Sequence, residues 1–432
     1  MNDWKKEYEQ KRITLDQVYG MIRSDDYICI SYNALEPMAF LENLHTIRDR
    51  VEHVRIRHGG LWKDYPFASQ KEMAGHFQAM TTFYDACNRK HHAEKLSSLV
   101  PGHMHNNTQR LLEDQKINIF YGMVTPMDRH GFMRLPLNMV YEMDALEAAD
   151  TVILQVNRNL PVVQGQNMVH IRDVDYIVEL DQENITISNI DPTDVEMKIG
   201  QYVAGLVPDG ATIQLGIGKI PNAVGKFLAE KNDLGVHTEM ITSIIADLAE
   251  QGVITCRRKT LHPGLIVGAF ALGSQKLYDY LDENPMVSIM RASYINNPAV
   301  IAKNDRMTSI NTCLQIDLTG QICSESLGTR QFSGPGGAGD FAVGASHAKE
   351  GKSIIAVHST AKNGTISTIQ PTLYPGSVVN ITRNDIDYIV TEYGVAKMKG
   401  RCIQDRVEQL IAISHPDFRD ELREKAKELM IW

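Results

Sequence analysis

The chain has 432 residues, more than a single core of ordinary size accommodates, so we expect two domains. Hydrophobic residues make up 43% and charged residues 22%, a composition typical of a soluble globular protein. The formal net charge is −9 and no long basic run occurs, which argues against nucleic acid as a partner.

The start of the chain is rich in charged residues and has no apolar core of a signal peptide. The most apolar stretch, GLIVGAFALG, is too short and too rich in glycine to cross a membrane. The six cysteines are dispersed and form no CxxC pair, which predicts reduced thiols. We therefore expect a cytoplasmic protein without a membrane partner.

Short strand-like runs alternate with amphipathic, helix-like segments along the chain. Strands are expected over residues 151–156, 211–218, 286–290, 352–359 and 377–382. Helices are expected between them, for example over residues 220–232 and 406–414. This alternation predicts an α/β fold with largely parallel sheets.

A weak internal repeat suggests that the two domains are related. Residues 25–44 can be laid on residues 209–228 without a gap, and each stretch reads as acidic turn, strand, small-residue loop, proline and helix. Chance similarity between two strand–turn–helix units is the alternative. We predict two related open α/β domains, an N-terminal one over residues 1–190 and a C-terminal one over residues 191–432.

A second pair of segments supports this repeat. MDRHGFMRL resembles IDLTGQICS, so that Asp128 and Gly131 match Asp317 and Gly320.

Two glycine-rich segments are candidates for ligand binding. In QLGIGKIPNAV, Gly216 and Gly218 follow a strand and Pro221 lies near a helix start, where free N–H groups attract anions. A tight turn without a ligand explains this pattern equally well. In FSGPGGAGDF, four glycines and a proline fall within six residues between Phe332 and Phe341. Such a loop exposes N–H groups that cradle phosphate or an oxyanion, and a flexible surface loop is the alternative.

The histidine-rich segments do not predict a metal site. His103 and His105 lie two residues apart, whereas zinc ligands usually have wider spacings and carboxylate or thiolate neighbours. We expect these histidines to line or cap loops, and we predict no metal.

Glu239, in LGVHTEMITS, is a carboxylate in an apolar stretch. One interpretation is a helix start with Thr238 as the cap, because the helix dipole stabilises an acidic residue there. The other is a nucleophile, since a carboxylate is ionised at neutral pH and becomes reactive once its solvation is removed.

Five motifs in order, QLGIGKIPNAV, DLGVHTEMITS, GPGGAGDF, TEYGVAKMKGR and SHPDFRDEL, resemble the acetyl-CoA hydrolase/transferase family. Within it the chain is similar to the 4-hydroxybutyrate and butyrate:acetyl-CoA CoA-transferases. The resemblance implies two α/β domains of the CoA-transferase type with the active site between them. It also implies that Glu239 is the catalytic residue and forms a glutamyl-CoA thioester during CoA transfer to a carboxylate.

The same resemblance implies further site residues. Asn311 and Gly336 correspond to an oxyanion and acyl pocket. The residues implied to bind CoA are Gln214, Leu215, Gly216, Ile217, Gly218, Gly336, Gly337 and Lys362. Met398 and Lys399 stand where relatives often have Leu-Arg, and a lysine lacks the bidentate grip of arginine.

The resemblance leaves the activity open in one respect. The main interpretation is a transferase that acts on acetyl-CoA, butyryl-CoA or 4-hydroxybutyryl-CoA and a short-chain carboxylate of fatty acid metabolism. An acyl-CoA hydrolase on the same scaffold is the alternative, and a non-catalytic CoA-binding regulator is a third. We expect CoA as a substrate without a permanently bound cofactor, and a homodimer or larger homo-oligomer.

Overall fold

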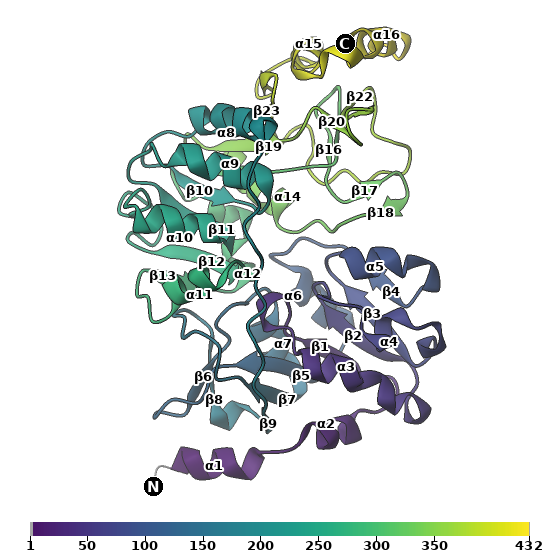
Figure 1. The fold of residues 1–432 in the computed structure, drawn as a ribbon, viewed down its shortest axis with the longest axis vertical. Helices are drawn as coiled ribbons and strands as arrows, with labels where there is room; N and C mark the ends of the chain where they lie inside the picture. The colour runs from purple at the N-terminus through teal and green to yellow at the C-terminus, as the bar shows by residue number, and fades with distance from the viewer. Residues whose placement is uncertain (1–2, 432) are drawn as a thin grey trace. The chain divides into compact units, whose positions relative to one another are not determined.

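A computed structural model describes residues 3–431, which form two compact units (Figure 1). The first unit runs up to Ile187 and includes Ala269–Ser293. The second comprises Ser188–Gly268 and the chain from Tyr294 on. The sequence predicted one continuous boundary after residue 190. In the structure, residues 269–293 instead belong to the first unit.

The first unit is built on a parallel sheet with the strand order β4-β3-β2-β1-β5-β7-β9 (Figure 1). Its strands are short runs of mostly buried apolar residues, as expected of a parallel sheet covered on both faces. These strands are β1 (Tyr27–Ile30), β2 (Val54–His58), β3 (Phe77–Thr81), β4 (Ser97–Leu99), β5 (Ile117–Val124), β7 (Ala149–Val156) and β9 (Tyr176–Glu179). A separate antiparallel pair joins β6 (Phe132–Arg134) and β8 (Met168–His170).

Helices of the first unit cover its sheet. The helices of this unit are α1 (Asp3–Lys11), α2 (Leu15–Met21), α3 (Met38–Asn43), α4 (Pro66–Ser69), α5 (Ala86–Lys90), α6 (Asn107–Asp114), α7 (Glu142–Ala148) and α11 (Gln275–Leu281). The apolar faces of α2, α3 and α4 meet Ile28, Ile56 and Tyr121 in one buried cluster, to which Val18 and Phe40 contribute.

The second unit contains the strand order β11-β10-β14-β19-β23-β24, parallel except for the antiparallel β24 at the edge. Its strands are β10 (Thr212–Leu215), β11 (Gly235–Ile241), β14 (Met307–Asn311), β19 (Lys352–Ala356), β23 (Tyr388–Thr391) and β24 (Gly394–Lys397). Two further strands, β12 (Ile266–Ala271) and β13 (Val287–Ile289), lie where the chain passes into residues 269–293.

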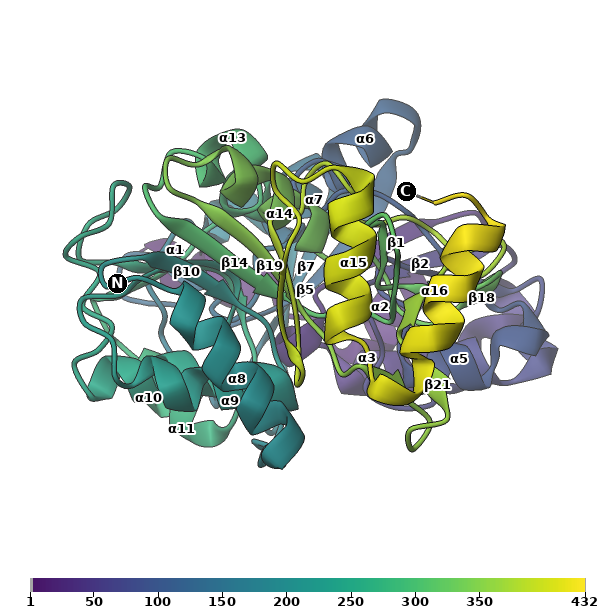
Figure 2. The ribbon, with the colours of Figure 1, turned by 90° about the horizontal axis from the view of Figure 1, so that it is seen from above.

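Several helices of the second unit lie side by side. Figures 1 and 2 both show α8 beside α9, and α15 beside α16. The last pair encloses an apolar cluster that includes Leu410 and Leu422. The helices are α8 (Asp194–Leu206), α9 (Lys219–Leu228), α10 (Ser243–Glu250), α13 (Pro298–Ile301), α14 (Ala338–His347), α15 (Ile403–Ile413) and α16 (Arg419–Glu428), and α12 (Ala292–Ile295) lies at the unit boundary.

Short strands complete the second unit beyond its main sheet. They form one three-stranded sheet and two hairpins. The strands are β15 (Gln315–Asp317), β16 (Ile322–Cys323), β17 (Ser326–Leu327), β18 (Arg330–Gln331), β20 (Thr360–Ala361), β21 (Ile366–Ser367) and β22 (Ile369–Gln370).

The two units share a strand order. The series β2-β1-β5-β7-β9 of the first corresponds to β11-β10-β14-β19-β23 of the second. The aligned segments 25–44 and 209–228 carry β1 and β10, which hold the same place in this order. The structure therefore confirms two related α/β units.

The second aligned pair forms the same turn in both units. Asp128 Oδ1 accepts hydrogen bonds from the second and fourth following amides, at 2.8 and 3.0 Å, and Asp317 Oδ1 does so at 2.9 and 3.0 Å. Gly131 and Gly320 then adopt φ of 89° and 94°, where glycine has no steric penalty. The spacing of acidic residue and glycine thus encodes one local structure twice.

Most of the expected strands are confirmed, but the prediction of a strand over residues 377–382 is wrong. This segment is irregular and makes one isolated bridge, between Ile381 and Ile322. The amide of Val378 donates instead to the side chain of Ser326, at 3.0 Å. Apolar, β-branched composition predicted a strand, but the backbone of this segment pairs with strand β16 only at Ile322, so no ladder forms.

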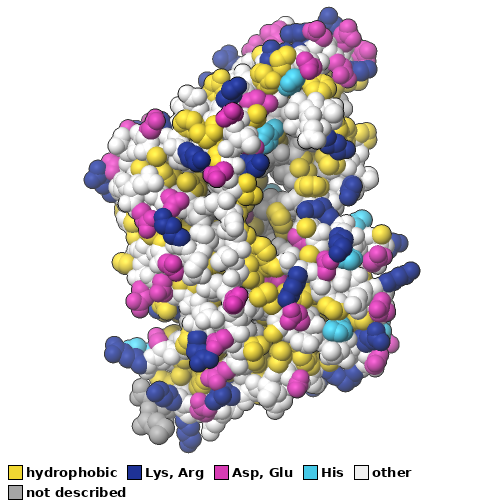
Figure 3. Space-filling model, in the orientation of Figure 1, with side chains coloured by type: hydrophobic (Ala, Val, Ile, Leu, Met, Phe, Trp, Pro, Cys, Tyr) yellow, Lys and Arg dark blue, Asp and Glu magenta, His cyan; other side chains and the backbone are white. Residues whose placement is uncertain are grey.

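The surface shows no dominant sign of charge on the visible face. Lys and Arg side chains alternate there with Asp and Glu (Figure 3). Among the described residues, no helix combines the length and apolarity needed to cross a bilayer.

Candidate functional site

Glu239 lies inside β11, near its carboxyl end. The helix-start interpretation is therefore wrong, because α10 begins only at Ser243, with Thr242 as its N-cap. The four strand residues before Glu239 are buried, and Glu239 itself is intermediate in exposure. In open parallel sheets, ligands bind beyond the carboxyl ends of the strands, which is where this carboxylate lies.

Two donors contact the Glu239 carboxylate. The side-chain amide of Asn296, Nδ2, donates to Oε2 at 2.9 Å. The main-chain N–H of Gly337 supplies a second hydrogen bond. Gly337 is the N-cap of α14, so the free N–H groups and positive dipole end of this helix lie next to the carboxylate.

Burial nevertheless raises the pKa of Glu239 to about 7. Desolvation by the surrounding protein is the largest cause, and the nearby charge of Asp340 acts in the same direction. The hydrogen bonds from Asn296 and Gly337 oppose this shift. Glu239 is therefore a desolvated carboxylate whose hydrogen bonds keep it able to ionise near neutral pH.

The loop before α14 approaches the carboxylate so closely that no side chain fits. A Cβ on Gly337 would lie 1.8 Å from Glu239 Oε2 and 2.1 Å from Asn296 Nδ2. Gly336 adopts φ of 50°, and a Cβ there would lie 3.7 Å from Glu239 Oε1. The glycine-rich loop predicted from the sequence is therefore brought to the predicted nucleophile by tertiary contacts.

Asn296 is not among the site residues predicted from the sequence. It lies between α12 and α13, next to Asn297, whose side chain caps α13 by accepting from the Ala299 amide at 2.9 Å. Asn-Asn-Pro before a helix already has a local explanation as a cap, so no signal in the chain singled out the first asparagine.

Asn311, which the resemblance assigned to the acyl pocket, pairs with Gln214. The two side-chain amides exchange hydrogen bonds of 3.1 Å in both directions, between adjacent strands β10 and β14. Gln214 also accepts from the Ile310 amide at 3.2 Å. The amide side chain that contacts Glu239 is that of Asn296.

The remaining residues predicted to bind CoA follow β10 or lie in a hairpin. Leu215 is buried in β10, Ile217 is exposed, and Gly218 caps α9 with φ of 118°. No atom lies within 4 Å of a Cβ built on Gly218, so space is open beside this loop. Lys362 is exposed in the turn of the β20–β21 hairpin.

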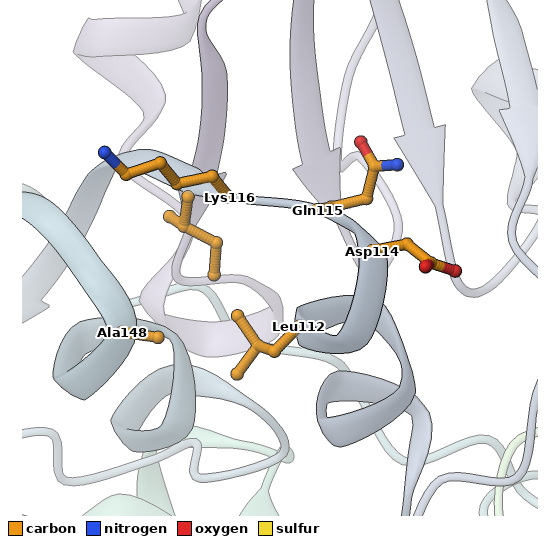
Figure 4. Close-up of a pocket in the computed structure, with 6 residues that line it drawn as sticks. Leu112, Asp114, Gln115, Lys116 and Ala148 are labelled. Carbon is orange, nitrogen blue, oxygen red and sulfur yellow. The ribbon is translucent and has the colours of Figure 1, made fainter.

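Other concave or histidine-rich regions do not resemble this site. An open depression in the first unit is lined by Leu112, Asp114, Gln115, Lys116, Ile117 and Ala148 (Figure 4). The His103 and His105 rings lie 5.7 Å apart between centroids. Within residues 3–431, no group of three or more His, Cys, Asp or Glu side chains is arranged to hold a metal ion.

Comparison with known sequences identifies the family. Residues 1–188 match the acetyl-CoA hydrolase/transferase N-terminal domain, and residues 273–426 match the acetyl-CoA hydrolase/transferase C-terminal domain. The chain belongs to the acetyl-CoA hydrolase/transferase family, as its motifs predicted.

Individual relatives match over nearly the whole chain. The succinyl-CoA:cyclohexane-1-carboxylate CoA transferase of Geobacter metallireducens is 40% identical over 99% of this chain and 97% of its own. The 4-hydroxybutyrate coenzyme A transferase of Clostridium kluyveri is 38% identical over 98% of this chain and 99% of its own. The crystal structure of RipA from Yersinia pestis superposes with a TM-score of 0.93 at 35% identity, over 99% of each chain.

Substitution of the two adjacent glycines should have unequal effects. Gly337→Ala places a methyl group on the Glu239 and Asn296 side chains, so we expect kcat for acyl-CoA turnover to fall by about 100-fold, the effect of a misplacement of about 1 Å. Gly336→Ala keeps its N–H, and its Cβ would lie 3.7 Å from Glu239 Oε1. The positive φ strains an alanine there, but kcat should still fall by less than about tenfold. Equal kcat values for the two variants, measured at matched folded fractions, would contradict this geometry.

Proposed function

We propose that the protein is an acyl-CoA:carboxylate CoA-transferase with Glu239 as its nucleophile. The observation that carries this proposal is the desolvated Glu239 carboxylate, held between the Asn296 amide and the Gly337 N–H. The similarity to CoA transferases over nearly the full chain supports the same activity. The proposed substrates are a short-chain acyl-CoA and a free carboxylate such as acetate, butyrate or 4-hydroxybutyrate.

The first half-reaction transfers CoA to the protein. A Glu239 oxygen attacks the thioester carbonyl, a C–O bond forms, and the C–S bond breaks to release CoA thiolate. The thiolate then attacks the glutamyl carbonyl of the mixed anhydride and expels the donor's carboxylate. Glu239 is left as a glutamyl-CoA thioester, and no proton has been gained or lost.

The second half-reaction reverses these bonds with a new acid. The acceptor carboxylate attacks the glutamyl thioester, forms a mixed anhydride and releases thiolate. The thiolate attacks the acceptor's acyl carbonyl, which yields the new acyl-CoA and regenerates the Glu239 carboxylate. Because every nucleophile is an anion, the reaction requires donors for negative charge and no general base.

The glycine-rich loop supplies those donors in this proposal. The N–H groups of Gly336 and Gly337 lie at the start of α14, where the helix dipole favours a developing oxyanion. Gly216 and Gly218 leave space for a pantetheine chain to pass close to the backbone after β10, and Lys362 is a candidate contact for a CoA phosphate.

Acceptor dependence distinguishes this activity from hydrolysis. With butyryl-CoA as donor, adding acetate should yield acetyl-CoA while total thioester stays constant. A hydrolase would instead release free CoA at a rate independent of acetate. Following both CoA thioesters by liquid chromatography and free thiol by a colorimetric reagent gives the two quantities in one assay.

The covalent intermediate should form on Glu239. Incubation with acyl-CoA alone, followed by borohydride reduction and peptide mass spectrometry, should show a modified residue in the peptide containing Glu239. Glu239→Gln should abolish the modification and lower kcat by at least about 1,000-fold, because an amide is not a nucleophile. Modification of another residue, or full activity without modification, would reject this assignment.

The raised pKa of Glu239 should be visible in kinetics. The nucleophile must be ionised, so kcat/KM should fall tenfold per pH unit below about pH 7, rather than below the usual range near 4. Asn296→Ala removes a hydrogen bond that lowers this pKa. The fall of kcat/KM on the acid side, the acid limb, should therefore begin at a higher pH. Asn304→Ala, which alters another buried asparagine of the same unit, is the matched control and should leave the limb in place.

A further inference from the structure

Asn296 belongs to a short joint whose orientation is fixed from both sides. It is the first of two residues between α12, which ends at Ile295, and α13, which begins at Pro298. On the far side, Asn297 caps α13. On the near side, the carbonyl oxygen of Ile295 lies 2.8 Å from Nε2 of His237. These contacts leave the Asn296 side chain directed at Glu239.

His237 is suited to hold this joint. It is fully buried, and its ring packs against Phe341 with centroids 6.2 Å apart. A carbonyl oxygen can only accept, so His237 Nε2 carries the proton and donates it to the Ile295 oxygen. Burial lowers the pKa of His237 to about 3, so the ring stays neutral and keeps this donor throughout the working pH range.

His237 and Glu239 lie two residues apart in β11, so their side chains leave the strand on the same face. One strand therefore carries both the nucleophile and a group that anchors the nucleophile's hydrogen-bond partner. We infer that His237 is a positioning residue, which acts through the Ile295 carbonyl to hold the Asn296 amide on the Glu239 carboxylate. This inference rests on the proposed role of Glu239 as nucleophile.

A second histidine anchors the same joint. His262 Nε2 lies 2.8 Å from the hydroxyl of Tyr294, one residue before Ile295. The charged and titratable groups facing His237 are Lys259 and His262, and both disfavour its protonation. Lys259 is itself held by two carbonyls, those of Val236 and Leu265, each at 2.7 Å. On the side of Glu239, the facing charged group is Asp340 of α14.

The distance between Glu239 and Asn296 is therefore set by the rigid geometry of a strand. Asn296 lies 57 positions after Glu239 in the chain, and a loop of this length would not by itself hold an amide at hydrogen-bond distance. His237 in β11 donates to the Ile295 carbonyl beside Asn296, so the strand that carries Glu239 also fixes the backbone that carries Asn296. The expected consequence is preorganisation of the nucleophile for attack.

A double-mutant cycle with His237→Phe and Asn296→Ala tests this inference. Phenylalanine keeps the ring beside Phe341 and removes the donor. We expect His237→Phe to lower kcat by roughly tenfold with little change in KM. It should also move the acid limb of kcat/KM upward, as Asn296→Ala does. In the Asn296→Ala background, His237→Phe should lower kcat by less than about twofold, because the group it positions is already absent.

Two further variants separate positioning from stability. His237→Gln retains an N–H donor and should recover much of the rate. If His237→Phe does not fold, His237→Leu, which also lacks a donor, replaces it in the cycle. Ser414→Ala, which removes another buried donor to a backbone carbonyl in the same unit, should lower thermal stability without moving the acid limb.

The outcomes are distinct from those that test the proposed function. Equal losses from His237→Phe with and without Asn296, or an unmoved acid limb, would overturn the positioning role while the thioester on Glu239 still forms. Failure to trap any adduct on Glu239 in the unaltered enzyme would overturn the proposed function, and the inference with it. Rates are normalised to the fraction of protein that forms the trapped adduct, so partial unfolding does not imitate a loss of positioning.

Discussion

Desolvation of the Glu239 carboxylate is the constraint around which the second unit is organised. A carboxylate in water is a weak nucleophile, and a carboxylate buried without partners would be protonated. The protein resolves this conflict by surrounding Glu239 while supplying the Asn296 amide and the N-terminal end of α14. Because desolvation outweighs the two donors, the group ionises near neutral pH.

Close approach of the backbone follows from that constraint. Main-chain N–H groups are the most compact donors available, and they reach the carboxylate only where no Cβ intervenes. Gly337 satisfies this requirement, since its missing side chain would occupy the space of Glu239 Oε2. The neighbouring Gly336 meets a second requirement, a positive φ that turns the chain into α14. Two adjacent glycines thus serve two different physical needs.

The two units share one strand order but differ in what surrounds the corresponding strands. Strand β11 of the second unit occupies the place that β2 holds in the first. The Asp128 and Asp317 turns preserve the same hydrogen bonds in both units, because a turn is encoded by a few neighbouring residues. Glu239, by contrast, has Asn296 and Gly337 as neighbours, and these come from segments far along the chain.

The sequence by itself determined the α/β class and the repeated Asp–Gly segments, and it singled out Glu239 and the glycine loop as candidates. Strand periodicity, the spacing of turn residues and motif order are local properties of the chain. The sequence did not determine that Glu239 lies in a strand, that residues 377–382 stay irregular, or that residues 269–293 belong to the first unit. Nor did it reveal Asn296, whose local pattern reads as a helix cap. Only the tertiary structure decided these points, because each depends on which distant backbone and side-chain groups become partners once the sheets have formed.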